Sequence, residues 1–318
     1  MNFSDAKDGS KFSLLSLDGG GIKGIFSAAV LAALEEDLNI KIADHFDLIA
    51  GTSTGGIIAI GLGLGLTPRQ ILNFYLDNAA KIFPSSNRRW FRGWLGVKYS
   101  NEPLIKSLKD IFGNKTFGCS TKRLIIPSYS LTSDEVYNFR TAHHVRLRRD
   151  YKIPAWQVAA ATSAAPTYFP AFREINNSRL VDGGVWANNP LMLGIVEAIT
   201  ALDADRSQMR AFSIGTTYSK NAYQDHFNTA GKLRWVSKMT NLFMTGQKHA
   251  SLNHAQLLLG KDNLSRVDFI VPGHELALDS IGGREILFAA AHEEVRKISP
   301  EFKERFVSRK VDEFLPIY

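Results

Sequence analysis

One serine in the sequence stands between glycines at the point where an apolar run ends. Ser53 lies in the stretch GTSTGG at 51–56, directly after the run Phe46–Ala50, which has the character of a buried strand. An apolar segment of helical length follows, so the pattern G-x-S-x-G falls at a sharp strand-to-helix turn that exposes a serine side chain. Gly51 and Gly55 remove side chains that would collide there, and the helix N-terminus favours developing negative charge. The pattern predicts a catalytic nucleophile, with a helix-capping serine in a tight turn as the alternative.

A second glycine-rich motif, DGGGIKG at Asp18–Gly24, follows the short apolar run Phe12–Leu17. Consecutive glycines before a helix expose backbone N–H donors with no side chain in the way, and such donors can surround an anion. One use is a phosphate cradle, although the motif lacks the GK[ST] ending of a P-loop and the G-x-G-x-x-G spacing with an acidic partner. Another use is an oxyanion hole built from Gly19, Gly20 and Gly21, in which each donor changes a rate by roughly 10²–10³. A structural turn is the third interpretation.

The third motif is DGG at Asp182–Gly184, behind the residues RLV. A carboxylate within hydrogen-bond reach of a serine hydroxyl can take its proton, so Asp182 could act as general base on Ser53. Aspartate beside Gly183 and Gly184 is also common turn chemistry, and this alternative wins for the motif taken singly. All three motifs follow predicted strands, and they would converge on the crevice where open α/β sheets bind ligands. Together they supply a nucleophile, oxyanion donors and a base.

Many serine hydrolases use a histidine between the serine and the acid. The histidines of this chain are His45, His143, His144, His226, His249, His254, His274 and His292. None follows a predicted strand between glycines, and His249 and His254 are five residues apart, which does not place them on one helix face as metal ligands. A Ser53–Asp182 dyad is therefore favoured over a triad, and no metal is expected.

The rest of the chain alternates strand-like and helix-like segments. Strands are predicted at 12–17, 46–50, 124–131, 136–140, 179–181, 210–214 and 267–271. Helices are predicted over Val30–Leu38, at 57–66, after Pro68, at 103–112, 154–163 and 190–202, within 228–259, and at 284–298. This alternation indicates βαβ units and a mainly parallel sheet. With no repeat or linker-like run, a single α/β domain over 1–318 is expected, in which the irregular segment at about 84–100 forms a flap.

Composition and charge limit the setting of the protein. The chain has a net charge of +7, a pI near 9.4 and one cysteine, Cys119. A basic surface favours anionic partners such as nucleic acid, acidic lipid or a phosphorylated small molecule, and a lone cysteine excludes an internal disulfide. The first residues lack a secretory signal, and the apolar stretch Ile57–Leu66 is too short to span a bilayer. We expect a cytoplasmic protein with only peripheral membrane contact.

With these motifs in this order, the sequence resembles the patatin-like phospholipase family. The matching stretches are DGGGIKG (18–24), GTSTGG (51–56), ATSAAPTYFP (161–170) and DGGVWANNP (182–190). The resemblance implies a three-layer α/β/α sandwich and hydrolysis of acyl ester bonds in lipids, without a cofactor. It also implies that Ser53 is the nucleophile, Asp182 its partner and Gly19, Gly20 and Gly21 the oxyanion loop. Two residues depart from the family: Lys23 stands where arginine is more frequent, and Thr217 ends SIGTT where glycine is frequent.

Two further expectations concern the substrate and an activator. The run Arg88, Arg89, Trp90, Phe91, Arg92, Gly93, Trp94 mixes cations with aromatics, and it could contact an anionic inner membrane surface or fold back onto the core. The chain is also similar in size and pattern to the bacterial patatin-like effectors that cyclic nucleotides activate in anti-phage defence. The basic stretch Val145–Arg149 could bind such a messenger, with a solvated face as the favoured alternative. No nucleic acid polymer is expected as partner.

Three classes of function therefore stand side by side. An acyl hydrolase requires both Ser53 and Asp182. A phosphate- or nucleotide-binding module would be stabilised by its ligand even after Ser53→Ala, because ligand binding to the native state raises stability without chemistry. A lipid-binding protein without turnover would associate with liposomes and would not react with a fluorophosphonate. The three motifs together favour the hydrolase.

Overall fold

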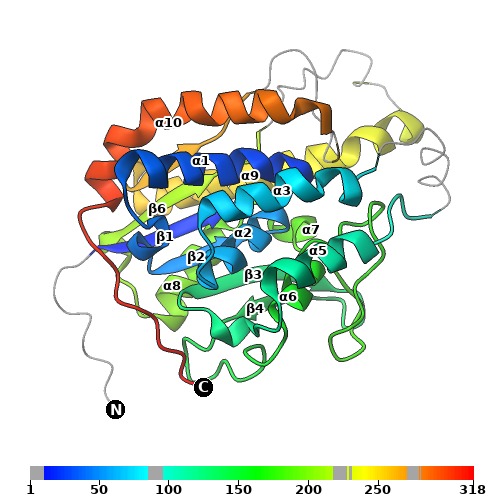
Figure 1. Cartoon of the computed structure of the whole chain (residues 1–318), viewed down its shortest axis with the longest axis horizontal. Helices are drawn as coiled ribbons and strands as arrows, with labels where there is room; N and C mark the ends of the chain where they lie inside the picture. The colour runs from blue at the N-terminus through cyan, green and yellow to red at the C-terminus, as the bar shows by residue number, and fades with distance from the viewer. Residues whose placement is uncertain (1–10, 85–95, 218–227, 229–230, 271–278, 280) are drawn as a thin grey trace.

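The computed structural model describes residues 11–84, 96–217, 228, 231–270, 279 and 281–318. Within these ranges seven strands form one sheet, in the order β4-β3-β2-β1-β6-β7, with β5 paired to β3 (Figure 1). The strands are β1 (Phe12–Leu17), β2 (Leu48–Gly51), β3 (Arg123–Ser130), β4 (Glu135–Arg140), β5 (Leu180–Asp182), β6 (Met209–Ile214) and β7 (Leu264–Val267). The pairs β1–β2, β2–β3, β1–β6 and β6–β7 are parallel, whereas β4 and β5 run antiparallel to β3. The predicted α/β fold with a mainly parallel sheet is confirmed.

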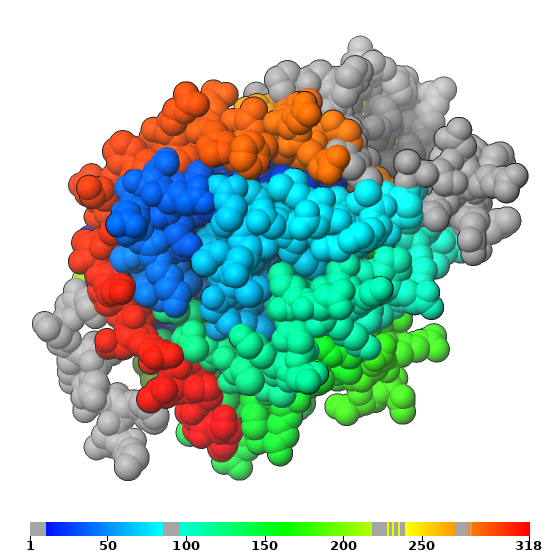
Figure 2. All heavy atoms as spheres, in the orientation of Figure 1, coloured from blue at the N-terminus to red at the C-terminus, as the bar shows by residue number. Residues whose placement is uncertain are grey.

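Helices cover both faces of this sheet. They are α1 (Gly24–Leu38), α2 (Thr54–Gly63), α3 (Pro68–Ile82), α5 (Glu102–Phe112), α6 (Ala155–Thr162), α7 (Gly184–Ala187), α8 (Leu191–Ala201), α9 (Lys232–Leu259) and α10 (Arg284–Phe306). In the space-filling view, α10, α1 and α3 lie side by side and cover one face of the sheet (Figure 2). Helices α8 and α9 pack on the other face. The three layers follow from strands that are apolar on both faces.

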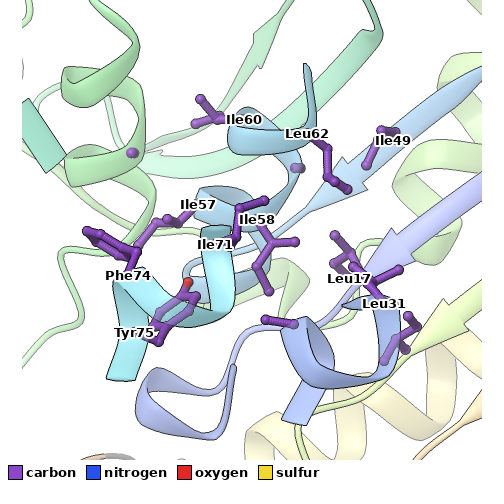
Figure 3. Close-up of a cluster of buried hydrophobic side chains, with 14 of the residues drawn as sticks. Leu17, Leu31, Ile49, Ile57, Ile58, Ile60, Leu62, Ile71, Phe74 and Tyr75 are labelled. Carbon is purple, nitrogen blue, oxygen red and sulfur yellow. The ribbon is translucent and has the colours of Figure 1, made fainter. Parts of the chain in front are cut away.

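Alternate residues of β1 show how the sheet divides the core. Leu15 and Leu17 belong to the larger cluster with α1, α2 and α3, whereas Leu14 packs with α8 and α9. Successive residues of a strand point to opposite faces. Because helices cover both faces of the sheet, all three side chains are fully buried. Figure 3 shows part of the larger cluster, in which Ile58 of α2 lies between Ile71 of α3 and Leu17 of β1, and Leu62 of α2 lies beside Ile49 of β2. This packing fixes α2 against the sheet, and thereby the turn that precedes α2.

Several elements differ in extent from their predictions. Strand β7 covers Leu264–Val267 and pairs with β6 there, so the prediction at 267–271 was about three residues late. Helix α10 continues through Pro300 to Phe306, where Phe302 and Phe306 pack against Phe212. Their ring centroids lie 4.9 and 5.5 Å from that of Phe212, in edge-on and tilted arrangements. Helix α2 begins at Thr54 rather than at residue 57, and the short α7 was not predicted.

The segment predicted as a flap lies partly outside the described residues, at 85–95. Its described end attaches to the body of the protein: Lys98 N–H donates to the carbonyl of Thr167 at 2.9 Å, and Tyr99 N–H donates to that of Tyr168 at 2.8 Å. Over the portions of the chain that can be described, no helix combines the length and the apolar character that crossing a bilayer requires.

Candidate active site

Ser53 occupies a strained turn between β2 and α2. Its backbone has φ 54° and ψ −121°, in a region that favours glycine and that persists only when neighbouring groups hold it. The N–H of Ser53 donates to Thr162 Oγ1 at 3.0 Å, and that hydroxyl donates to the carbonyl of Pro127 at 2.6 Å. Helix α6 and strand β3 thus hold the turn in this conformation.

The flanking glycines allow α2 to approach the sheet closely. A Cβ on Gly55 would lie 2.3 Å from the carbonyl oxygen of Leu17, and a Cβ on Gly51 would lie 2.3 Å from that of Gly55. Both contacts are with backbone atoms, which cannot move aside. The two glycines therefore allow α2 to pack closely against β1 and β2. This packing places Ser53 at the end of the sheet.

The structure brings Ser53 and Asp182 together. Ser53 Oγ donates to Asp182 Oδ2 at 2.6 Å, and the N–H of Gly184 donates to Asp182 Oδ1 at 2.7 Å. Ser53 and Asp182 are 9% and 6% exposed. Burial raises the pKa of Asp182 to about 6, although the hydrogen bonds from Ser53 and Gly184 oppose this shift. A carboxylate with such a pKa can accept a proton near neutral pH.

Gly183 lets the DGG motif lie against β3. A Cβ at this position would be 2.3 Å from the carbonyl oxygen of Pro127, the same carbonyl that accepts from Thr162. The N–H of Gly183 donates to the backbone carbonyl of Thr162 at 3.3 Å. Thr162 therefore connects the turn at Ser53 with the motif that carries Asp182.

The first glycine motif divides into two parts. The N–H of Gly19 donates to the carbonyl of Asn188 at 2.9 Å, so this donor is occupied and does not face a substrate in this conformation. Gly20 and Gly21 line the pocket that contains Ser53. Gly21 has φ 58°, and a Cβ on Gly20 would lie 2.1 Å from Thr216 Oγ1, so both positions require glycine.

The remaining residues of this motif start α1. Lys23 ends the short 3-10 turn Gly21–Lys23 and does not line the pocket. Gly24 is the first residue of α1, and a Cβ on it would lie 2.0 Å from Thr54 Oγ1. The close approach of α1 to the start of α2 therefore depends on this glycine.

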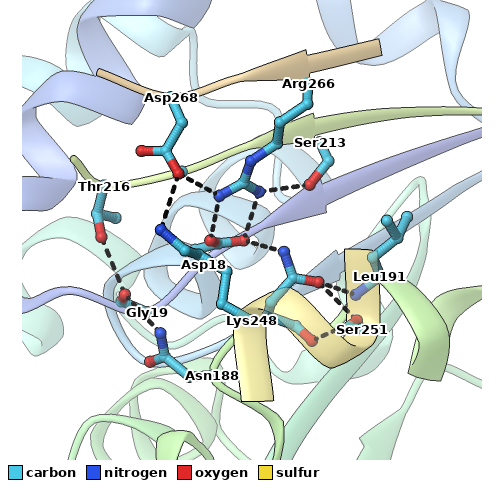
Figure 4. A network of polar contacts seen from close by, with 12 residues as sticks. Asp18, Gly19, Asn188, Leu191, Ser213, Thr216, Lys248, Ser251, Arg266 and Asp268 are labelled. Carbon is cyan, nitrogen blue, oxygen red and sulfur yellow. Dashed lines mark hydrogen bonds and ion pairs between the residues drawn. The ribbon is translucent and has the colours of Figure 1, made fainter. Parts of the chain in front are cut away.

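A buried network of charges holds Asp18, the first residue of the glycine motif (Figure 4). Arg266 of β7 binds both oxygens of Asp18, at 3.0 and 2.6 Å, and it also binds Asp268 at 2.7 Å. Lys248 of α9 lies 3.3 Å from Asp268, and Ser213 of β6 accepts from Arg266 at 2.6 Å. Burial alone would lower the pKa of Arg266, but the two carboxylates outweigh burial and raise it. The residue directly before Gly19 is thus fixed by β7.

Asn188 and Thr216 hold the loop from the side. Asn188 Nδ2 and Thr216 Oγ1 both donate to the carbonyl of Gly19, at 3.3 and 3.0 Å (Figure 4). Two donors therefore bind this carbonyl, and the next residues, Gly20 and Gly21, lie at the pocket wall.

The pocket above Ser53 has a volume of about 310 Å³ and is lined mainly by apolar groups. Helix α3 contributes Phe74 and Tyr75, and the segment after α6 contributes Tyr168 and Phe169. Tyr75 Oη donates to the carbonyl of Thr54 at 2.8 Å, so α3 is tied to the start of α2. Such a volume and lining suit an acyl chain, and the polar groups stand at one end, where an ester would react.

None of the histidines that the structure describes lines this pocket. His45, His143, His144, His249, His254 and His292 all lie away from the pocket, whereas His226 and His274 lie outside the described residues. His143 is buried against Glu197, with Nε2 and Oε1 3.0 Å apart, and burial lowers its pKa. Among the positions that are described, no group of three or more His, Cys, Asp or Glu residues could hold a metal ion.

Some functional groups escaped the sequence analysis, and some predictions cannot be placed. Arg88, Arg89, Trp90, Phe91, Arg92 and Trp94 lie outside the described residues. Thr162 and Asn188 stood within the quoted motifs without a role, and Arg266 had no local signal in the sequence. The contacts of these three residues are with partners far away in the sequence, so no short motif around them indicates their role.

The sheet, the strained serine turn and the apolar pocket together define a lipid acyl hydrolase. The family model "Patatin-like phospholipase" matches residues 15–195. A cGAMP-activated phospholipase of Escherichia coli (strain TW11681) is 32% identical over 313 residues, which cover 88% of this chain and 85% of the relative. The chain belongs to the patatin-like phospholipase family.

Two further matches, one curated protein and one solved structure, extend the comparison. A cGAMP-activated phospholipase of Vibrio cholerae serotype O1 is 35% identical over 225 residues, which cover 64% of this chain and 63% of the relative. Among solved structures, VipD from Legionella pneumophila is 14% identical with a TM-score of 0.47, covering 92% of this chain and 67% of that chain. This last likeness is too distant to support a statement about function.

Proposed function

We propose that this lipid hydrolase cleaves an acyl ester of a phospholipid, with Ser53 as nucleophile and Asp182 as the base that activates it. The observation that carries the proposal is the 2.6 Å hydrogen bond from Ser53 Oγ to Asp182 Oδ2 inside an apolar pocket. No third side chain is needed to transfer the proton, because the carboxylate contacts the hydroxyl directly. The hydrogen bond from Gly184 holds the carboxylate in place.

The reaction takes two steps. Ser53 Oγ attacks the ester carbonyl carbon while its proton passes to Asp182 Oδ2, and the backbone amides of Gly20 and Gly21 stabilise the oxyanion. When the intermediate collapses, the bond to the alcohol breaks, and Asp182 returns the proton to the leaving lysophospholipid oxygen. A water molecule then attacks the acyl-serine, Asp182 takes a proton from that water, and the proton returns to Ser53 Oγ as the fatty acid leaves.

Variants of the dyad test this proposal. Ser53→Ala and Asp182→Asn should each lower kcat/KM for phospholipid vesicles by at least about 10⁴-fold, because each removes a group that acts in the transition state. A fluorophosphonate should label the wild type and Ser163→Ala, which alters another serine of the same pocket, but not Ser53→Ala. Mass spectrometry of the products should show free fatty acid and lysophospholipid. Hydrolysis by folded Ser53→Ala at the wild-type rate would refute the assignment.

We also propose that a cyclic nucleotide activates the protein. Two relatives at 32% and 35% identity are named cGAMP-activated phospholipases, and the first matches 88% of this chain. The basic character of the chain, with a net charge of +7, suits a ligand that carries two phosphates. A role in antiviral defence would follow from such activation.

A further inference from the structure

Three large apolar side chains on the first half of α9 are turned outward. Met239, Leu242 and Phe243 are 42%, 36% and 57% exposed. Their spacing of three and four residues places them on one side of the helix. Exposed apolar groups that gather on one helix face are typical of a surface that binds a protein or a lipid. We call this set the α9 face.

The α9 face is continuous with the rim of the pocket. Phe243 lines the pocket together with Thr240, Met244 and Gln247 of the same helix. Gln247 Nε2 donates to the carbonyl of Val185 at 2.9 Å, and Val185, itself 42% exposed, also lines the pocket. The outward apolar surface of α9 therefore passes without a break into the cavity that holds Ser53. In Figure 1 this yellow part of α9 lies on the side of the molecule where α3 ends.

The charge of α9 points to the kind of surface it meets. The helix carries Lys232, Arg234, Lys238 and Lys248 and no Asp or Glu in its 28 residues. Lys248 pairs with Asp268, and the other three precede the α9 face in the sequence of the helix. A basic helix with exposed Met, Leu and Phe has the composition of helices that lie in the interface of an anionic bilayer.

We propose that the α9 face docks on an anionic phospholipid bilayer and delivers an acyl chain from it to the pocket. The proposal rests on the proposed function, since a lipid substrate must leave a bilayer before Ser53 can reach it. With Met239 and Leu242 in the acyl region, Phe243 would lie at the boundary between bilayer and pocket. The acyl chain then moves from one apolar environment, the bilayer, to another, the pocket, without crossing water. This removes the free-energy cost of exposing its apolar surface.

Vesicle binding by Ser53→Ala protein tests the docking without any catalysis. The test variant is Met239→Ser/Leu242→Ser in this background, because neither side chain lines the pocket. The matched control is Leu257→Ser, which removes a side chain that is 84% exposed on the same helix, about 20 Å from Phe243. Flotation with phosphatidylglycerol and with phosphatidylcholine vesicles, with and without cGAMP, gives the apparent affinity of each protein.

The double variant should bind phosphatidylglycerol vesicles roughly tenfold or more weakly, whereas Leu257→Ser should bind like the parent. In the Ser53-intact protein, the double variant should hydrolyse a short-chain monomeric ester normally and vesicles slowly. If the parent with Ser53 intact also failed to hydrolyse either ester, the proposed function would be refuted, and vesicle binding by the Ser53→Ala proteins would still decide the docking. Equal binding by the double variant and the parent, or no vesicle binding under any condition, would overturn the proposal. If the protein were a dimer that the double substitution dissociates while vesicle binding stays unchanged, the α9 face would bind a second copy of the protein. This result would also overturn the proposal.

Discussion

In the proposed mechanism, the carboxylate of Asp182 does for Ser53 the work that a histidine does in other serine hydrolases. Asp182 is buried, so its pKa of about 6 lies well above the ordinary value of 3.8. An aspartate with an ordinary pKa would be too weak a base to hold a proton during the attack. Burial raises the pKa of Asp182 and so makes it a stronger base. The same burial makes the ionised form costly to the folded state, which links activity to stability.

The activity should therefore follow the ionisation of Asp182. Below pH 6, kcat/KM for a monomeric ester should fall about tenfold per pH unit, because only the ionised carboxylate accepts the proton of Ser53. Above about pH 7 the rate should level off. A pH profile measured from 4.5 to 8.5 checks this, and a rate that stays constant down to pH 4.5 would contradict the role of Asp182 as base.

Stability should change in the opposite direction. The folded-state pKa of about 6 exceeds the unfolded value of 3.8, so the stability gained from the protonated form is complete below pH 3.8 and lost as pH rises through 6. At pH 8 the difference corresponds to about 3 kcal/mol. Asp182→Asn does not titrate, so its free energy of unfolding should rise relative to the wild type between pH 4 and pH 8. Urea denaturation at these two pH values measures the change, and a constant difference would contradict it.

At this scale the sequence predicted that Ser53 and Asp182 would meet, but it did not predict the groups that hold them in place. Ser53 and Asp182 stand in short motifs whose glycines signal a tight turn. Thr162, which accepts from the N–H of Ser53, stands in a run of small residues, and its role arises only when α6 packs on β3. The amide of Gly19 was predicted to face the substrate, but it donates to Asn188, 169 residues further along the chain.

At the scale of elements, β7 connects the edge of the sheet to the glycine loop. Arg266 and Asp268 stand at the end of β7, Ser213 belongs to β6, and Lys248 belongs to α9. Burial alone would raise the pKa of Asp268, but Arg266 and Lys248 outweigh it and hold that pKa below its ordinary range. The sequence predicted β7 about three residues late because the apolar run after Asp268 resembles a strand, whereas pairing with β6 ends at Val267.

Removing the arginine should destabilise the protein strongly. Arg266→Met leaves Asp18 buried without its bidentate partner, and this should lower the free energy of unfolding by about 3–5 kcal/mol at pH 7. Arg266→Lys keeps the charge but loses the fork that binds both oxygens, so a smaller loss is expected. Equilibrium unfolding in urea measures both. Matching values for Arg266→Lys and Arg266→Met would show that charge contributes little.

At the scale of the whole molecule, the fold class and the order of the motifs could be predicted, because alternating strands and helices permit few arrangements. The path of α10 beyond Pro300 could not be predicted, because a proline favours a helix end, whereas Phe302 and Phe306 pack against Phe212 in the core. The single domain over 1–318 and the flap at about 84–100 stay predictions.

The proposed activation by a cyclic nucleotide would involve the whole molecule. At 100 times its Kd, cGAMP should stabilise the native state by about 2.7 kcal/mol, which raises Tm by several degrees. The same rise is expected for Ser53→Ala, since binding does not require the reacting serine. Hydrolysis of vesicles by the wild type should increase with cGAMP. If cGAMP changed neither Tm nor the rate of vesicle hydrolysis, the proposal that it activates this protein would be refuted.

The bond between Arg266 and Asp18 joins residues 248 positions apart. During translation, the serine turn and the DGG motif leave the ribosome long before Arg266 does, so the glycine loop lacks its buried support until the last sixth of the chain is being made. A nascent or truncated chain therefore cannot complete the site.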